Sequence, residues 1–212
     1  MTDEMRTGAI PLPRSPVAHL ADQCAAAGSA DCAALRELPL LAQVELRVDA
    51  EEAQAASRMA AEFLGCALPG PGRASGDGHP YTLWCGPGWY LVVDAAATGH
   101  GLTAGLTAAL GGEYGALCGS VVDVSAQRTV LELRGPRAGA VLARGCVLDL
   151  HPRVFSPGDY AQTVLAGAAV GIHRAGEAAD GPAYRILVRA SYADHLVRWL
   201  LDAVAAEAAD QN

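Results

Sequence analysis

The chain has 212 residues, of which 51% are hydrophobic, and a formal net charge of −8. This length suits one ordinary core or two small ones. The acidic balance disfavours nucleic acid as a partner, because phosphate contacts need clustered cations. The sequence contains no lysine, so all 15 basic residues are arginine. This absence excludes a Gly-Lys-Ser phosphate-binding loop, a pyridoxal Schiff base and a lysine general base.

The cysteine pattern and the N-terminal sequence indicate a reducing compartment. The six cysteines lie at wide intervals, with no Cys-x-x-Cys pair and no histidine at metal-ligand spacing, so neither a zinc site nor a dithiol site is predicted. The first residues lack the features of a signal peptide. We therefore expect free thiols in a cytoplasmic protein. No membrane span is expected, because the longest apolar stretch, residues 164–172, is about half the required length.

The first part of the chain predicts an arm, a strand and a helix. Residues 1–38 are rich in alanine and interrupted by proline, which predicts a flexible N-terminal arm with one short helix. Hydrophobic and polar residues alternate over residues 41–48, as in a half-exposed strand. Asp49 and Glu52 then match the reciprocal capping pattern of a helix over residues 50–64.

A hairpin and a second helix follow. Residues 81–85 and 89–93 are joined by Gly-Pro-Gly and predict two antiparallel strands. Leucines four residues apart over residues 99–110 predict a helix, which ends at Gly111 and Gly112. The order is therefore strand, helix, two strands and helix.

The second half repeats this order. Residues 128–134 predict a strand with an extended lead-in at residues 121–125, and Pro136 begins a short helix that ends at Gly145. Three further extended segments are predicted at residues 162–165, 169–174 and 184–189. A closing helix is predicted from Ser191 onward.

The repeated order predicts an α+β fold of two similar halves, in which helices cover one side of antiparallel strands. We expect the first half at residues 39–112 and the second at residues 113–207, packed as one unit. Residues 208–212 are expected to form a short tail.

A glycine pattern imitates part of a dinucleotide-binding loop. Gly99, Gly101 and Gly105 precede a predicted helix, and Asp123 follows about where an acidic ligand to a ribose would lie. The strand before these glycines belongs to the hairpin, however, and the chain lacks an alternating series of strands and helices. A helix start in a chain with 24 glycines is the favoured interpretation, and a nucleotide-dependent oxidoreductase is the weaker hypothesis.

The remaining polar residues do not assemble into a catalytic site. Asp149, His151 and Arg153 form a local cluster that could suggest general base catalysis, but no nucleophile stands near them. The other histidines are scattered, and the three tryptophans are expected to be core or interface anchors. We therefore predict no catalytic, cofactor-binding or metal-binding residue on this chain.

Several segments resemble one protein family. The segments are Val-Val-Asp-Val-Ser-Ala-Gln-Arg-Thr-Val-Leu-Glu-Leu-Arg at residues 121–134, Gly-Pro-Arg-Ala at 135–138, Gly-Cys-Val-Leu-Asp-Leu-His-Pro at 145–152, Gln-Thr-Val-Leu-Ala at 162–166, Tyr-Arg-Ile-Leu-Val-Arg at 184–189 and Ser-Tyr-Ala-Asp at 191–194. Together they resemble the gamma subunit family of heterotetrameric sarcosine oxidase. The resemblance covers about residues 35–206.

This resemblance implies a complex of alpha, beta, gamma and delta chains. Such a complex oxidises sarcosine to glycine with oxygen, releases hydrogen peroxide and passes the methyl carbon to tetrahydrofolate. FAD, FMN, NAD and tetrahydrofolate are expected on the other subunits, and no catalytic residue is attributed to gamma. The expected role of this chain is therefore that of a non-catalytic accessory subunit that forms interfaces.

The alternative is a free-standing folate protein. The Asp-Val-Ser and Gly-Pro-x-Ala elements also resemble the folate-binding aminomethyltransferase of the glycine cleavage system, to which the gamma subunit is similar in fold. A folate-dependent C1 transferase or folate-binding protein would need an acid near N5 and N10 of the folate. Asp123 is the candidate for that acid, although a structural role at a strand end is the favoured interpretation.

Overall fold

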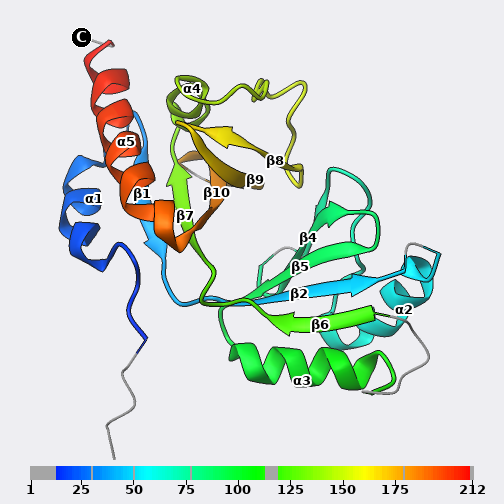
Figure 1. Ribbon diagram of the computed structural model, residues 1–212. Helices are drawn as coiled ribbons and strands as arrows, with labels where there is room; N and C mark the ends of the chain where they lie inside the picture. The colour runs from blue at the N-terminus through cyan, green and yellow to red at the C-terminus, as the bar shows by residue number, and fades with distance from the viewer. Residues whose placement is uncertain are drawn as a thin grey trace, which may run out of the picture.

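Two antiparallel sheets carry the fold, and helices cover one face of each sheet (Figure 1). The computed structural model describes residues 13–29, 31–49, 51–76, 78–112, 119–178 and 180–210. Within these residues each sheet has five strands. The predicted α+β class, with two similar sets of antiparallel strands and covering helices, is confirmed.

The first sheet, called the N-terminal sheet below, has the strand order β3-β4-β5-β2-β6. Its strands are β2 (Ala42–Val48), β3 (Ala74–Ser75), β4 (Tyr81–Gly86), β5 (Trp89–Asp94) and β6 (Gly119–Asp123). Helices α2 (Ala53–Leu64) and α3 (Gly99–Ala109) share one core with buried side chains of this sheet, such as Val44 and Leu46. The predicted hairpin and the helix over residues 99–110 are thus confirmed.

The second sheet, called the C-terminal sheet, has the order β1-β7-β10-β9-β8. Its strands are β1 (Ala34–Leu38), β7 (Arg128–Arg134), β8 (Tyr160–Leu165), β9 (Ala168–Ala178) and β10 (Gly181–Arg189). The covering helices are η1 (Ala18–Leu20), α1 (Ala21–Ala27), α4 (Ala138–Ala143) and α5 (Ala190–Ala209). No helix of the described residues is both long and apolar enough to cross a membrane.

The predicted capping of α2 by Asp49 and Glu52 is wrong. The helix begins at Ala53, and Glu52 occupies the N-cap position without a side-chain capping hydrogen bond. The backbone N–H of Glu52 instead donates to the carbonyl of Asp49 at 2.9 Å, which forms a turn before the helix. The predicted C-terminal end is confirmed, because Gly65 adopts the left-handed conformation (φ +69°) that terminates helices.

Much of the predicted N-terminal arm belongs to the folded body. Residues 1–12 lie outside the described residues, but η1, α1 and β1 all contribute to the C-terminal core. Cys32 and Leu35 are 1% and 3% exposed, and β1 is bonded along its length to β7. The prediction of a flexible arm up to residue 38 is therefore wrong for residues 18–29 and 31–38, since burial and strand pairing fix them.

The two sheets exchange their edge strands. Strand β1 leads directly into β2 but pairs with β7, and β6 leads into β7 but pairs with β2. Figure 1 shows the two connections passing each other between the sheets. The expected boundary between residues 112 and 113 therefore does not separate the sheets, because the predicted lead-in strand of the second half completes the N-terminal sheet.

Hydrogen bonds fasten the two crossing connections to each other. Gln43 at the start of β2 is 1% exposed, and its Nε2 donates to the carbonyl of Arg128 at 2.8 Å. Its backbone N–H donates to Ser125 Oγ at 3.0 Å, and its carbonyl accepts the N–H of Val124 at 2.8 Å. The start of β2 and the chain that leads into β7 are thus held side by side.

The faces without helices turn partly toward each other. Successive side chains of a strand point to opposite faces, so Leu131 of β7 packs under the helices while Val130 faces the other sheet. The buried hydrophobic cluster between these open faces contains Leu41, Tyr81, Leu83, Leu91, Val93, Val130, Tyr160 and Leu187. This cluster joins the sheets into one packed body.

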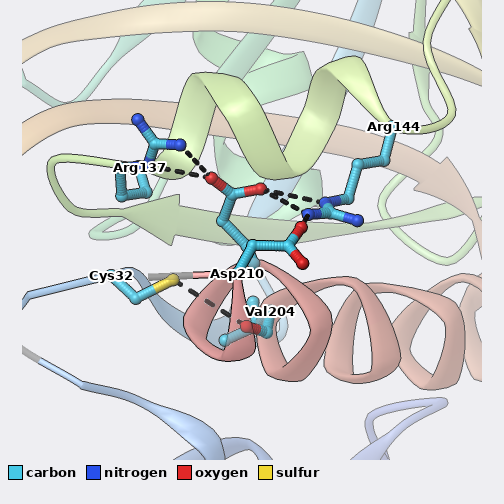
Figure 2. Close-up of polar contacts among 6 residues, drawn as sticks. Cys32, Arg137, Arg144, Val204 and Asp210 are labelled. Carbon is cyan, nitrogen blue, oxygen red and sulfur yellow. Dashed lines mark hydrogen bonds and ion pairs between the residues drawn. The ribbon is translucent and has the colours of Figure 1, made fainter. Parts of the chain in front are cut away.

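A buried carboxylate connects α4 to the end of α5. Glu207 is 4% exposed and accepts hydrogen bonds from Arg137 Nε at 2.8 Å and Arg144 Nε at 2.9 Å. These arginines flank the two ends of α4 and approach from opposite sides (Figure 2). Chiefly through the hydrogen bonds from Arg144, the pKa of Glu207 lies below its ordinary 4.5.

We predict that Glu207→Gln lowers the free energy of unfolding by about 1–3 kcal/mol, because two guanidinium groups lose a charged acceptor. Urea denaturation followed by circular dichroism measures the change. The control is Glu62→Gln, which neutralises an exposed glutamate of α2 and should leave the denaturation midpoint unchanged.

The same pair of proteins tests the pKa of Glu207. A lowered folded pKa means that the stabilisation is fully present above pH 4.5 and is lost as the pH falls through the folded value. The difference in stability between the wild type and Glu207→Gln should therefore shrink below pH 4.5. A difference that stays constant down to pH 3 would contradict the assignment.

Candidate functional site

The glycines of the dinucleotide-like pattern serve close packing. Gly99, Gly101 and Gly105 all lie in α3. A Cβ atom at Gly99 would lie 2.1 Å from Asp123 Oδ2, and one at Gly105 would lie 2.2 Å from the Phe63 ring. Strand β5, which precedes α3, pairs antiparallel with both neighbours, so the parallel βαβ unit of a dinucleotide site is not formed.

Asp123 ends β6 and holds the following turn. Its Oδ1 accepts the backbone N–H of Ser125 at 2.9 Å and the Ser125 hydroxyl at 2.6 Å. Ser125 Oγ in turn accepts the N–H of Gln43. The Asp-Val-Ser element therefore stabilises the connection between β6 and β7 through hydrogen bonds. The Asp123 carboxylate has a structural role.

The cluster of Asp149, His151 and Arg153 forms a local turn. Asp149 Oδ1 accepts the backbone N–H of His151 at 2.9 Å, and His151 Nδ1 accepts the backbone N–H of Arg153 at 3.2 Å. All three residues are exposed. The carboxylate does not orient the imidazole, so the arrangement is not the acid–histidine pair of a catalytic triad.

A row of polar side chains crosses the open face of the C-terminal sheet. The strand register places Arg185 beside Glu132 on one side and His173 on the other. The Arg185 guanidinium lies 4.4 Å from the centre of the Tyr81 ring, which comes from the N-terminal sheet. Burial, followed by the charge of Arg185, lowers the pKa of His173 to about 3. His173 is therefore neutral at physiological pH and supports packing between the sheets.

A cleft of about 180 Å³ lies farther along the same two faces. Polar residues of both sheets line it. They are Glu45, Cys85 and Trp89 from the N-terminal sheet, and Arg128, Tyr160, Gln162, Thr163 and Arg189 from the C-terminal sheet. Gln162 Nε2 donates to the carbonyl of Cys85 at 2.7 Å and bridges the sheets beside the cleft.

The chemistry of this cleft favours binding. Burial raises the pKa of the Cys85 thiol to about 11 and also raises the pKa of Tyr160, which lines the same space. Both groups are protonated near neutral pH, so neither is an activated nucleophile. Among the described residues, no group of three or more His, Cys, Asp or Glu side chains is placed to hold a metal ion.

Sequence reasoning missed the cleft, although it named one of its residues. Trp89 was expected to be a core or interface anchor, and it lines the cleft with Arg47 stacked 4.3 Å from its ring centre. Arg128 and Arg189 were not singled out. The sequence feature that could have pointed to them is their position. Each lies at the end of a strand, on the face opposite to the hydrophobic residues that pack under the helices.

Comparison with known proteins decides the family. The sequence profile of the sarcosine oxidase gamma subunit family matches residues 47–207. This chain belongs to that family. The resemblance predicted from the short motifs is therefore confirmed across most of the sequence.

Individual gamma subunits match over nearly their whole length. The sarcosine oxidase gamma subunit of Arthrobacter sp. is 40% identical over 196 residues, covering 91% of this chain and 90% of the relative. That of Corynebacterium sp. strain U-96 is 38% identical over 208 residues, with 96% of both chains covered. The family assignment thus does not depend on one conserved segment.

Solved structures support the same fold. A chain of the heterotetrameric sarcosine oxidase from Corynebacterium sp. U-96, in complex with pyrrole 2-carboxylate, superposes with a TM-score of 0.79 at 37% identity, covering 92% of this chain and 96% of that one. Aminomethyltransferase T from Bartonella henselae gives a TM-score of 0.59 at 17% identity, covering 81% of this chain and 46% of that protein. The likeness to the aminomethyltransferase shows the fold alone. It agrees with the aminomethyltransferase-like fold that the sequence motifs predicted.

We predict that Asp123→Ala lowers the free energy of unfolding by about 1 kcal/mol, because Ser125 loses its acceptor. Asp123→Asn should cost less, since the amide oxygen still accepts the Ser125 N–H. Chemical denaturation of both variants measures the effect. If the asparagine variant is as unstable as the alanine variant, the negative charge and not the hydrogen-bond acceptor is what the fold uses.

Proposed function

We propose that this chain is a non-catalytic gamma subunit of a heterotetrameric sarcosine oxidase. The observation that carries the proposal is the match to gamma subunits over 90–96% of their length, together with a TM-score of 0.79 to a chain of the Corynebacterium heterotetramer. The complex would oxidise sarcosine to glycine, reduce oxygen to hydrogen peroxide and transfer the methyl carbon to tetrahydrofolate.

The alpha, beta and delta chains would be the partners, in the cytoplasm. We propose that FAD, FMN, NAD and tetrahydrofolate bind to those chains and that gamma binds none of them. The geometry of the described residues supports a non-catalytic role for gamma. Asp123, His151 and His173 are engaged in turns or in packing between the sheets, which gives each of them a structural role.

The alternative remains a free-standing folate-binding or C1-transferring protein. Its support is the aminomethyltransferase-like fold and a cleft between the two sheets. It would require tetrahydrofolate to bind the isolated chain and a carboxylate to act on the bound folate. The two proposals therefore differ in a measurable way, since one needs partner chains and the other does not.

The proposal requires that this chain assembles with partner chains. A tagged copy of this chain, expressed in its native host, should co-purify with three other chains and with yellow flavin absorption, and the material should produce hydrogen peroxide from sarcosine. Omitting this chain from co-expression of the four should abolish recovery of the intact complex. A chain that elutes alone and colourless would overturn the assignment to the oxidase and favour the folate alternative.

The proposal also requires that side chains of this subunit stay outside the chemistry. In the assembled complex, Asp123→Asn and His151→Ala should change kcat for sarcosine by less than about twofold, because a residue outside the chemistry does not alter transition-state binding. Steady-state peroxide production measures kcat. A loss of about 100-fold or more in either variant, with the complex intact, would show that this chain supplies a catalytic group.

A further inference from the structure

We propose that the cleft between the two sheets binds a small carboxylate, held by Arg128 and Arg189 beside Trp89. The proposal concerns this chain alone and stands independently of the assembly described above. A cleft of about 180 Å³ is not accounted for by an accessory role. Its charged groups, buried donors and size together define the chemical class of ligand that it would accept.

Two guanidinium groups stand next to each other at this cleft. Arg128 begins β7 and Arg189 ends β10, and the register pairs them directly across the two strands. Neighbouring side chains of a register pair lie on the same face of a sheet. Both arginines line the cleft, and within the described residues neither forms an ion pair with a carboxylate.

Two side chains that line the cleft each carry one buried donor without an acceptor within the described residues. The donors are Nη1 of Arg128 and Nε1 of Trp89. A buried donor without an acceptor costs about 1–3 kcal/mol, and more when it is charged. A carboxylate in the cleft would bring acceptor oxygens beside these side chains, which would have to reorient for the buried donors to reach them. Guanidinium groups bind carboxylates with particular strength because two parallel hydrogen bonds can form.

The acidic residue of the cleft already has a partner. Glu45 Oε1 accepts a hydrogen bond from Arg47 Nε at 2.6 Å, so its charge is compensated locally. Cys85 and Tyr160 stay neutral because burial raises the pKa of each. Within the described residues the charge of Arg128 and Arg189 is therefore left without a counterion, which makes the cleft favourable for an anion in a protein of net charge −8.

The size and the apolar walls favour an organic anion. A cavity of about 150 Å³ holds a benzene molecule, and this cleft is slightly larger. Leu91 and Leu187 supply apolar surface, and Gly171 leaves room for the Tyr160 ring, because a Cβ atom there would lie 2.5 Å from its hydroxyl. A carboxylate on a small apolar or aromatic body matches both the donors and these walls.

The test uses benzoate and its neutral analogue benzamide, titrated by calorimetry into the purified full-length chain. Benzoate should bind with one-to-one stoichiometry and at least about 10-fold more tightly than benzamide. Arg128→Met and Arg189→Met should each weaken benzoate about 10-fold or more, since a charged hydrogen bond is lost. Arg58→Met is the matched control, because it removes an exposed arginine of α2 outside the cleft, and it should bind benzoate like the wild type.

Several outcomes would overturn the proposal. They are equal affinity for benzoate and benzamide, equal affinity in Arg189→Met and Arg58→Met, or no saturable binding of benzoate at concentrations up to about 10 mM, the weak limit for a ligand of this size. A further arm repeats the titration on the assembled complex. Binding to the isolated chain that disappears in the complex would show that a partner subunit covers the cleft, and would overturn the proposal of a free ligand for the assembled protein.

Discussion

The exchange of β1 and β6 between the two sheets is the constraint on which the rest of the structure depends. Each sheet takes an edge strand from the connection that leads into the other sheet. The buried Gln43 amide fastens the crossing, because its side chain and backbone bond to the connection before β7. Neither sheet is therefore complete without chain from both sides of the crossing, which explains why helices and strands of two similar halves behave as one body.

The crossing also determines what the open faces can do. It brings them close enough to share a hydrophobic cluster, but their polar ends remain apart and leave a cleft. Some charged side chains on these faces form ion pairs and others do not. Glu132 lies between Arg36 and Arg134 at 2.6 and 3.3 Å, whereas Arg128 and Arg189 lack such a partner within the described chain. The same sheet thus contains a structural ion-pair network and a candidate binding surface.

Features that depend on local periodicity were predictable, and features that depend on distant pairing were not. The hairpin, α3 and β7 follow from alternation and from leucine spacing. The strand pairing of β1 was missed because its alternation is short and its partner residues lie 92–100 positions later, from Leu38 with Val130 to Ala34 with Arg134. The capping of α2 was mispredicted, since a matching residue pattern does not ensure that the side chains form the bonds. The cleft was missed because it arises only where two sheets meet.

The strand exchange has a consequence for synthesis on the ribosome. Strand β1 leaves the ribosome well before β7, its only neighbour in the described sheet, because 94 residues separate Ala34 from Arg128. At translation rates of about 5–20 residues per second, this interval lasts roughly 5–20 s. During it β1 is a nascent strand without its native neighbour, and such an edge can join other chains. The order in which the sequence is made thus leaves a window in which chaperones or early association with other chains would matter.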